Sequence, residues 1–210
     1  MIHEHLKLKM KVLLKDGFNH FIYPKFSPKF AERIWINPND VMGIIRLGKK
    51  YSAKVIDFNL KDFSDMIREL HDDERIKSCI DHWINAIPWE ETTDYRKKVY
   101  ELKNTGKTWD NDCFSVKDLD RKYQFLDQLF MELSQTRKML TSEQIDQNHF
   151  RELNTFGIHI GSKGELYLDS GGYHRFAIAY ILKLERVPAR LGAIDKRQLS
   201  KLKELRRKAI

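Results

Sequence analysis

The segment from Glu165 to Ile194 constrains the fold most, because it predicts a strand, a glycine turn, a helix and a second strand in succession. Leucines alternate with a tyrosine over 166–168, as they do in a half-buried strand. The Asp-Ser-Gly-Gly run at 169–172 breaks that strand. Residues 173–183 are rich in Ala, Ile, Phe and Leu and predict a helix, and residues 187–194 predict the second strand. This order indicates a protein that combines helices with a small β-sheet.

The glycine turn of this segment predicts an anion-binding site at the start of the helix. The first N–H groups of a helix have no partner within the helix, and the helix dipole is positive there. His174 and Arg175 occupy this first turn, where cations are unfavourable unless an anion or a carboxylate compensates them. Two interpretations stay open. The turn binds phosphate or a nucleotide, or it is structural and Arg175 pairs with a nearby Asp.

Asp169 ends the first strand of the segment, immediately before the glycine turn. A carboxylate at this position can orient Arg175, hold a magnesium ion or accept a proton from a substrate hydroxyl. It can also serve only to cap the turn. Ligands of open α/β sheets gather outside the carboxyl ends of strands, which favours a place for Asp169 in a site.

A β-hairpin is predicted just before the turn, over residues 156–168. In it, Ile158 and Ile160 mirror Leu166 and Leu168 across a Gly-Ser-Lys-Gly turn. The hairpin would supply two neighbouring strands of the sheet.

Further short elements are predicted between residues 33 and 59. Residues 33–36 predict a strand and 37–40 a turn. We expect a short helix or a loop at 41–46 and a brief strand at 54–59. The Gly-Lys-Lys run at 48–50 is a basic loop, which is either an ordinary exposed turn or a second contact to phosphate.

The first thirty residues contain an alternating segment and an aromatic run. Apolar and basic residues alternate over 6–14, which is compatible with a strand. We expect the aromatic run, which two prolines interrupt, to lie extended across a hydrophobic surface as packing anchors. The alternative is a base-stacking platform beside basic residues. The aromatic residues are Phe18, Phe21, Tyr23, Phe26 and Phe30.

The region from 60 to 139 is predicted to be mostly helical, because apolar residues recur there at helical spacing. Start signals at 62–65 predict a first helix, and a second pattern runs up to Pro88. A third helix is expected to end at Gly106. Ser115 is expected to cap a long fourth helix. Core packing accounts for all of these apolar stripes.

Positive charge is concentrated at the end of the chain. The net charge is +8, and residues 196–210 hold seven Lys and Arg residues against one Glu. This predicts a basic final helix with an N-terminal cap formed by Asp195 and Gln198. The helix is either a solvated surface or, in the alternative interpretation, a nucleic-acid contact through Lys201, Arg206 and Arg207.

Cysteine and histidine usage argues against a metal centre and for a reducing compartment. Cys79 and Cys113 have no zinc-like spacing and are expected to be free thiols. The eight histidines form no ligand cluster in the sequence. We also expect no signal peptide and no membrane span. The predicted location is cytoplasmic.

The Gly-Gly-Tyr-His-Arg run at 171–175 resembles the signature of the ParB/sulfiredoxin-like superfamily. In that superfamily a strand leads into a glycine turn, a His-Arg or Arg-Arg pair, a small-residue helix and a further strand. The resemblance covers residues 158–194 and extends weakly to 33–41. Sulfiredoxins have Gly-Gly-Cys-His-Arg at this turn, and Tyr173 stands at the place of the cysteine. The resemblance therefore does not imply reduction of a sulfinic acid.

The resemblance implies an α+β fold, namely a ParB-like single domain over 1–210 with a small mixed sheet and a large helical insertion at 60–140. ParB proteins are CTP-binding DNA clamps whose nucleotide domain is followed by a helix-turn-helix domain. Too few residues follow Ile194 for such a domain. The superfamily also contains small ParB-like kinases. This branch implies transfer of phosphate from a nucleotide (ATP, ADP or CTP, with Mg²⁺) to a small-molecule or sugar hydroxyl, or nucleotide hydrolysis.

The resemblance also implies roles for individual residues of the turn. Asp169, His174 and Arg175 would be catalytic, and Asp169 would also hold the metal. The phosphates would lie on Ser170, Gly171, Gly172 and Tyr173. The competing function is a non-enzymatic nucleic-acid-binding module that uses the basic C-terminal helix. The oligomeric state is left open.

Overall fold

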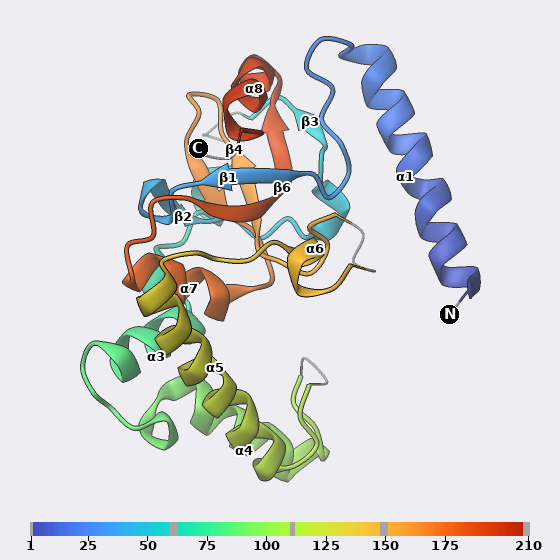
Figure 1. Ribbon diagram of the computed structural model, residues 1–210. Coiled ribbons are helices and arrows are strands. Elements are labelled where there is room, and N and C mark those ends of the chain that lie inside the picture. The colour runs from blue at the N-terminus through green and yellow to red at the C-terminus, as the bar shows by residue number, and fades with distance from the viewer. Residues whose placement is uncertain (1, 59–62, 110–111, 148–150, 208–210) are drawn as a thin grey trace. The chain divides into compact units, whose positions relative to one another are not determined.

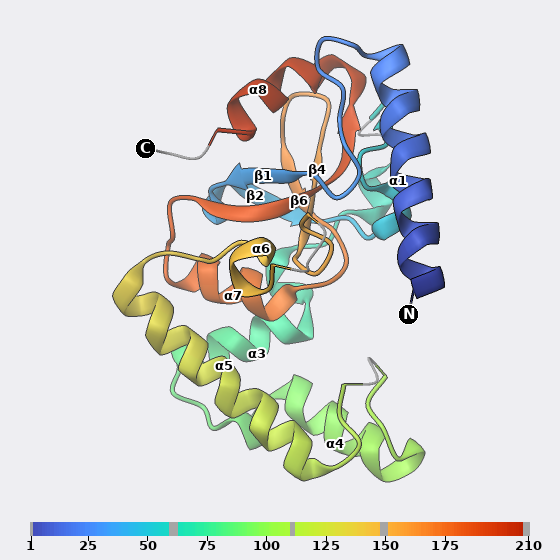
Figure 2. The same cartoon turned by 45° about the vertical axis from the view of Figure 1, so that its right-hand side comes forward.

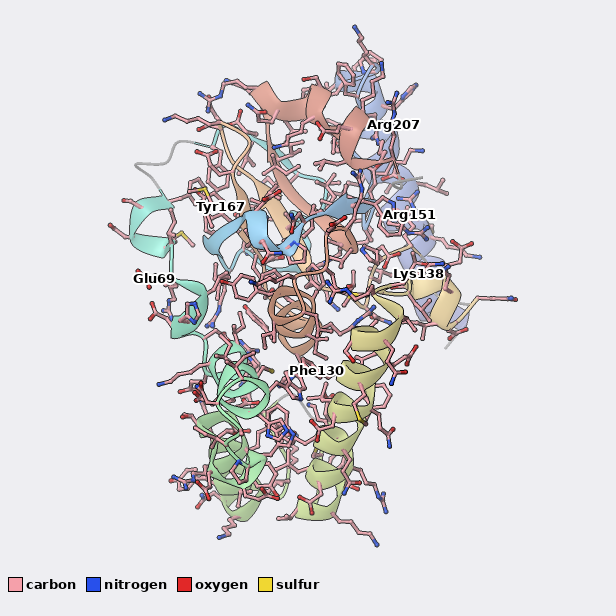
Figure 3. The ribbon with its side chains drawn as sticks, turned by 60° about the vertical axis from the view of Figure 1, so that its left-hand side comes forward. Glu69, Phe130, Lys138, Arg151, Tyr167 and Arg207 are labelled. Atoms are coloured by element: carbon pink, nitrogen blue, oxygen red, sulfur yellow. The ribbon has the colours of Figure 1, made fainter. Side chains whose placement is uncertain are left out.

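The computed structural model describes residues 2–58, 63–109, 112–147 and 151–207, without the side chains of 2–8 and 11. The chain divides into two compact units (Figure 1). The sheet unit consists of Met1–Arg68, Met139–Gly172 and Glu185–Ile210, and the helical unit of Glu69–Lys138 and Tyr173–Leu184. Glu69 and Lys138, which bound the longer segment of the helical unit, are labelled in Figure 3.

The sheet unit contains a six-stranded mixed sheet with the order β1-β6-β4-β5-β2, and β3 pairs with β6 outside this path. β6 pairs in parallel with β4 and β3 and antiparallel with β1. The prediction that helices combine with a mixed sheet is confirmed. The strands are β1 (Arg33–Ile36), β2 (Val41–Ile44), β3 (Val55–Ile56), β4 (Gly157–Ile160), β5 (Leu166–Leu168) and β6 (Val187–Asp195).

The predicted hairpin is confirmed with its register. β4 and β5 pair antiparallel, so that Ile158 lies opposite Leu168 and Ile160 opposite Leu166. All residues of β4, β5 and β6 are buried. Burial of both faces explains why β6, apart from Arg190 and its last residue Asp195, is small and apolar rather than alternating.

The prediction of a short helix or loop at 41–46 is wrong, because this segment contains strand β2. β2 pairs in parallel with β5, and its Ile44 also forms a bridge with Arg68. At Gly43 an added Cβ would lie 2.8 Å from the carbonyl oxygen of Arg68. The backbone of other segments therefore packs closely on both sides of β2. Pairing with these segments makes 41–44 a strand, although the local sequence does not specify one.

The N-terminal segment is helix α1 (Ile2–Ile22), so the predicted strand at 6–14 is wrong. Leu, Lys and Met are good helix formers, which outweighs the short alternation of apolar and basic residues. Val12 packs with Phe30 and Ala31, and Asp16 accepts the Phe30 N–H at 2.7 Å. Figure 2 shows α1 alongside the rest of the sheet unit.

Only part of the aromatic run acts as packing anchors. Phe30 is buried, but Phe18 and Phe21 lie on α1 with 65% and 83% of their surface exposed. The expectation of an extended aromatic segment is therefore wrong for these two residues. The helix that carries them turns them toward solvent.

Short helices complete the sheet unit. α8 packs against β1 (Figure 1). Asp195 caps the C-terminal segment, but it accepts from the Arg197 N–H and not from Gln198 as predicted. The start signals at 62–65 lead to a 3-10 turn rather than a helix, and Asp62 lies outside the described residues. These elements are η1 (Pro38–Asp40), η2 (Lys49–Tyr51), η3 (Ser64–Met66), α6 (Ser142–Ile145), η6 (Lys196–Lys201) and α8 (Leu202–Leu205).

The helical unit confirms most of the predicted helices and two of their caps. Gly106 ends α4 with φ of 72°. The Ser115 side chain accepts the Asp118 N–H at the start of α5. The helix predicted to run up to Pro88 ends earlier, at Trp83. The elements are η4 (Leu70–Asp72), α3 (Glu74–Trp83), η5 (Trp89–Glu91), α4 (Thr93–Thr105), α5 (Val116–Thr136) and α7 (Tyr173–Ile181).

Aromatic side chains of the helical unit gather around one carboxylate. Asp127 accepts indole N–H groups from Trp83 at 3.0 Å and from Trp89 at 3.1 Å. The Trp83 ring stacks on Phe130 of α5, which is labelled in Figure 3, at a centroid distance of 4.5 Å.

None of the helices in the described part of the chain has both the length and the apolar character needed to span a membrane.

Candidate functional site

Two loops of the sheet unit meet because β2 and β5 run in parallel and end at the same edge of the sheet. The loop after β5 begins with Asp169, and the loop after β2 contains Leu47 and Gly48. Asp169 Oδ1 accepts the N–H of Gly48 at 2.8 Å and that of Leu47 at 3.1 Å. The basic loop at 48–50 is therefore fixed to the start of the glycine turn.

Asp169 is a buried carboxylate, with 1% of its surface exposed. His159 Nδ1 accepts the Ala193 N–H at 2.8 Å, so the neutral ring carries its hydrogen on Nε2. This Nε2 faces Asp169 Oδ1 at 3.3 Å. Burial alone would raise the pKa of Asp169, but the close contact with His159 and the hydrogen bonds from the backbone of Gly48 and Ser170 lower the pKa to about 2.

These contacts do not fit Asp169 as a magnesium ligand or as a general base. Oδ1 already accepts several hydrogen bonds, and a carboxyl with a pKa near 2 is a weak base at neutral pH. Among the described residues, no group of three or more His, Cys, Asp or Glu side chains is placed to hold a metal ion. We therefore assign Asp169 a positioning role.

Asp169 also faces a residue that the sequence did not single out, Arg190 of β6. Arg190 is 1% exposed. Its Nη2 lies 3.4 Å from Asp169 Oδ2 and 3.5 Å from the Ser170 carbonyl oxygen. Both distances are long for hydrogen bonds of a charged donor, which are about 2.7–2.9 Å. Within the described structure, Nε and Nη1 of Arg190 have no hydrogen-bond partner.

A glycine creates the room for this buried guanidinium. A Cβ added at Gly157 would lie 2.7 Å from Arg190 Nη2 and 3.1 Å from the Asp169 Cβ. Burial lowers the pKa of Arg190 from its ordinary value, and Asp169 offsets part of this effect. Apart from Arg190 and its last residue Asp195, β6 is apolar or small, so the single arginine within it was the available sequence signal.

Lys49 adds a second positive charge to the same region. It belongs to η2, the turn that follows Gly48. Partial burial of its ammonium group lowers the pKa of Lys49, and the charge of Arg190 lowers the pKa further. Two cations that repel each other, one of them with unpaired donors, form a place where an anion would be stabilised.

The glycine turn requires its glycines for different reasons. Gly171 has φ of 93° and Gly172 has φ of 65°, which are backbone angles that residues other than glycine rarely adopt. An added Cβ at Gly172 would lie 2.6 Å from the backbone nitrogen of Phe156, whereas at Gly171 it would meet nothing within 4 Å. Gly172 therefore packs against Phe156, the residue that precedes β4, whereas open space lies beside Gly171.

We expect Gly172→Ala to be more destabilising than Gly171→Ala. Both substitutions place alanine in left-handed backbone, at about 1–2 kcal/mol each. Gly172→Ala also forces its Cβ onto the Phe156 backbone, which adds about 1–3 kcal/mol. Urea unfolding of the two variants measures the difference. Equal destabilisation would contradict the packing described for Gly172.

The remaining residues predicted for the turn belong to the helical unit. The buried Tyr173 ring faces the Arg75 guanidinium at 3.6 Å from its centroid. His174 Nε2 lies 3.3 Å from Asp94 Oδ2. Burial would raise the pKa of Asp94, but the hydrogen bond from His174 lowers it below its ordinary value. A histidine oriented by a carboxylate is an arrangement typical of a general base.

The basic C-terminal segment uses two of its three predicted nucleic-acid residues for contacts within the chain. Arg206 pairs with Glu32 through Nε and Oε1 at 2.5 Å and donates to the Ser27 carbonyl oxygen at 2.6 Å. Lys201 Nζ donates to the Gly164 carbonyl oxygen at 2.8 Å. Arg207, labelled in Figure 3, is exposed.

Comparison of the chain with protein-family models, with curated proteins and with solved structures gives no match. The resemblance to the ParB/sulfiredoxin-like superfamily therefore rests only on the residues that carry it.

Proposed function

We propose that the sheet unit binds the phosphate groups of a nucleotide at a site formed by Lys49, Ser170, Gly171 and Arg190, here called the phosphate site. The observation that carries this proposal is the buried Arg190 guanidinium with Nε and Nη1 unpaired. A buried charge is costly unless it is paired and hydrogen-bonded. A ligand that accepts hydrogen bonds from Nε and Nη1 would explain why an arginine occupies this buried position.

Phosphate fits the donors of this site better than a carboxylate does. A guanidinium offers a planar fork that pairs with two oxygens at once, and a phosphate presents three oxygens to several donors. Arg190 and Lys49 supply two positive charges, which match the charge of a phosphate group. The open space beside Gly171 lets a ligand approach the backbone of the turn.

The resemblance to ParB-like kinases supports phosphotransfer as the reaction. In this proposal, the oxygen of an acceptor hydroxyl bonds to the γ-phosphorus, and the bond from phosphorus to the bridging oxygen breaks. The nucleoside diphosphate leaves with that oxygen. The hydroxyl proton passes to solvent water. Water as the acceptor would give nucleotide hydrolysis.

The proposal is tested by a binding screen followed by a transfer assay. ATP, ADP, CTP and GTP are added to the protein with and without magnesium, and thermal unfolding is followed. A nucleotide at about one hundred times its dissociation constant stabilises the protein by about 2.7 kcal/mol. Transfer of labelled γ-phosphate to sugars and other small hydroxyl compounds is then measured, with release of free phosphate as the hydrolysis readout.

Absence of a thermal shift with all four nucleotides would overturn the proposed function.

A further inference from the structure

A basic and aromatic groove lies between α1 and the segment that contains η2 and β3, all within the sheet unit. Its volume is about 540 Å³. In the described part of the chain, its lining includes three lysines and no Asp or Glu, so the groove presents positive charge to a ligand. The lining of this α1–η2 groove consists of Lys15, Phe18, Asn19, Tyr23, Lys50, Tyr51, Lys54 and Val55.

Aromatic rings lie next to these lysines. Phe18 is 65% exposed on α1. The ammonium groups of Lys54 and Lys50 lie 4.6 Å and 5.6 Å from the centroid of the Tyr51 ring. Tyr23 is half-buried at the end of the helix. Rings that can stack with bases, beside cations that can pair with phosphates, match the chemistry of a single nucleic-acid strand.

The walls of the groove are held at a fixed separation. Asn19 is buried, and its side-chain N–H groups donate to the carbonyl oxygens of Pro28 at 2.8 Å and Ala53 at 2.9 Å. Ala53 lies between Tyr51 and Lys54 in the sequence, so this bond ties the helical wall to the opposite wall. A preformed groove loses little conformational entropy when it binds its ligand.

We propose that the α1–η2 groove binds single-stranded nucleic acid. Bases stack on Phe18, Tyr23 and Tyr51, and backbone phosphates pair with Lys15, Lys50 and Lys54. A duplex keeps its bases stacked inside the helix and would leave the rings of the groove unused. The interaction is independent of the phosphate site, because Arg190 does not line the groove.

A single strand fits this concave surface better than an anionic bilayer does. A bilayer is flat and meets protruding apolar side chains at its surface. Among the described side chains of α1, the exposed apolar residues outside the groove lining are Met10, Leu13, Leu14, Phe21 and Ile22, so a bilayer would bind beside the groove rather than in it.

The test measures binding of fluorescein-labelled dT12 and rU12 to the whole protein by fluorescence anisotropy, over a series of salt concentrations. Each phosphate contact to a single strand contributes about −0.7 to the slope of log affinity against log salt, so three lysines predict about −2. Lys50→Ala/Lys54→Ala should reduce the slope to about −0.7. The matched control, Lys163→Ala/Lys203→Ala, removes the same charge from exposed positions outside the groove.

Phe18→Ala tests the aromatic part of the groove without a change in charge. Loss of one stacking ring is expected to weaken binding about tenfold to hundredfold while the salt slope stays the same. Phe18 is exposed, so the variant should fold as the wild type does. Arg190→Met should retain oligonucleotide binding.

Three results would overturn the proposal. The first is the absence of oligonucleotide binding at low salt. The second is equal weakening in the groove variant and the matched control, which would show unspecific charge attraction. The third is tighter binding of a duplex, or of vesicles with anionic lipids, that Phe18→Ala leaves unchanged.

Discussion

Arg190→Met is expected to abolish nucleotide binding while leaving the protein as stable as the wild type or more stable. The buried guanidinium loses its hydration on folding and, within the described residues, gains two long contacts, to Asp169 and Ser170. In this variant Asp169 keeps its hydrogen bonds from the backbone N–H groups of Leu47 and Gly48, which stabilise its charged form, so its carboxylate is not left without partners. The nucleotide, in contrast, loses its only planar pair of donors in the phosphate site.

The measurement combines urea unfolding with the thermal shift produced by nucleotide. The wild type should gain about 2.7 kcal/mol at one hundred times the dissociation constant, and the variant should gain nothing. Arg207→Met, which makes the same change at an exposed arginine, is the matched control and should behave like the wild type. An Arg190→Met variant that is destabilised by more than about 3 kcal/mol would show that the arginine is structural.

Asp169→Asn is expected to lower the free energy of unfolding by about 3–5 kcal/mol, the range for breaking a buried ion pair. The substitution leaves the Arg190 charge without a counter-charge. An asparagine that keeps its oxygen toward the Gly48 N–H also turns its amide hydrogens toward the Arg190 guanidinium, so that donor faces donor. Urea unfolding followed by circular dichroism measures the loss.

The pH dependence of this difference has a defined sign. The pKa of Asp169 is lowered to about 2 in the folded protein, against about 3.9 in an unfolded chain. Its contribution to stability is therefore present above pH 4 and is lost as the pH falls from 4 toward 2. The difference between wild type and Asp169→Asn should shrink over this window.

The double variant Asp169→Asn/Arg190→Met separates the two residues. Removal of the guanidinium should restore most of the stability that Asp169→Asn loses, because the uncompensated charge is gone. A double variant as unstable as Asp169→Asn alone would contradict the role of Asp169 as the partner of Arg190. It would place the whole effect in the hydrogen bonds to Leu47 and Gly48.

Local signals predicted the elements around the site. The alternating apolar residues of the hairpin gave β4 and β5 with their register, and Gly106 and Ser115 marked helix ends. The glycine turn was also predicted, and Gly172 is required there for packing as well as for its φ. These features depend on residues close in the sequence, where pattern and turn chemistry carry the information.

The parts that depend on distant residues could not be predicted. β2 is a strand because β5 and the backbone of Arg68 flank it. The role predicted for Asp169 did not include Arg190 or the Gly48 N–H, which come from other strands and loops. A lone arginine in an apolar strand gives no sign of which carboxylate it will face.

The most direct measurement is the NMR signal of the Arg190 Nε–Hε group, identified by its absence from the Arg190→Met spectrum. The proposed site predicts that this signal shifts during a titration with the nucleotide that binds, because Nε gains a phosphate oxygen as its acceptor. The Arg207 signal should not move. An Arg190 signal that stays in place while the nucleotide saturates the protein would contradict the phosphate site.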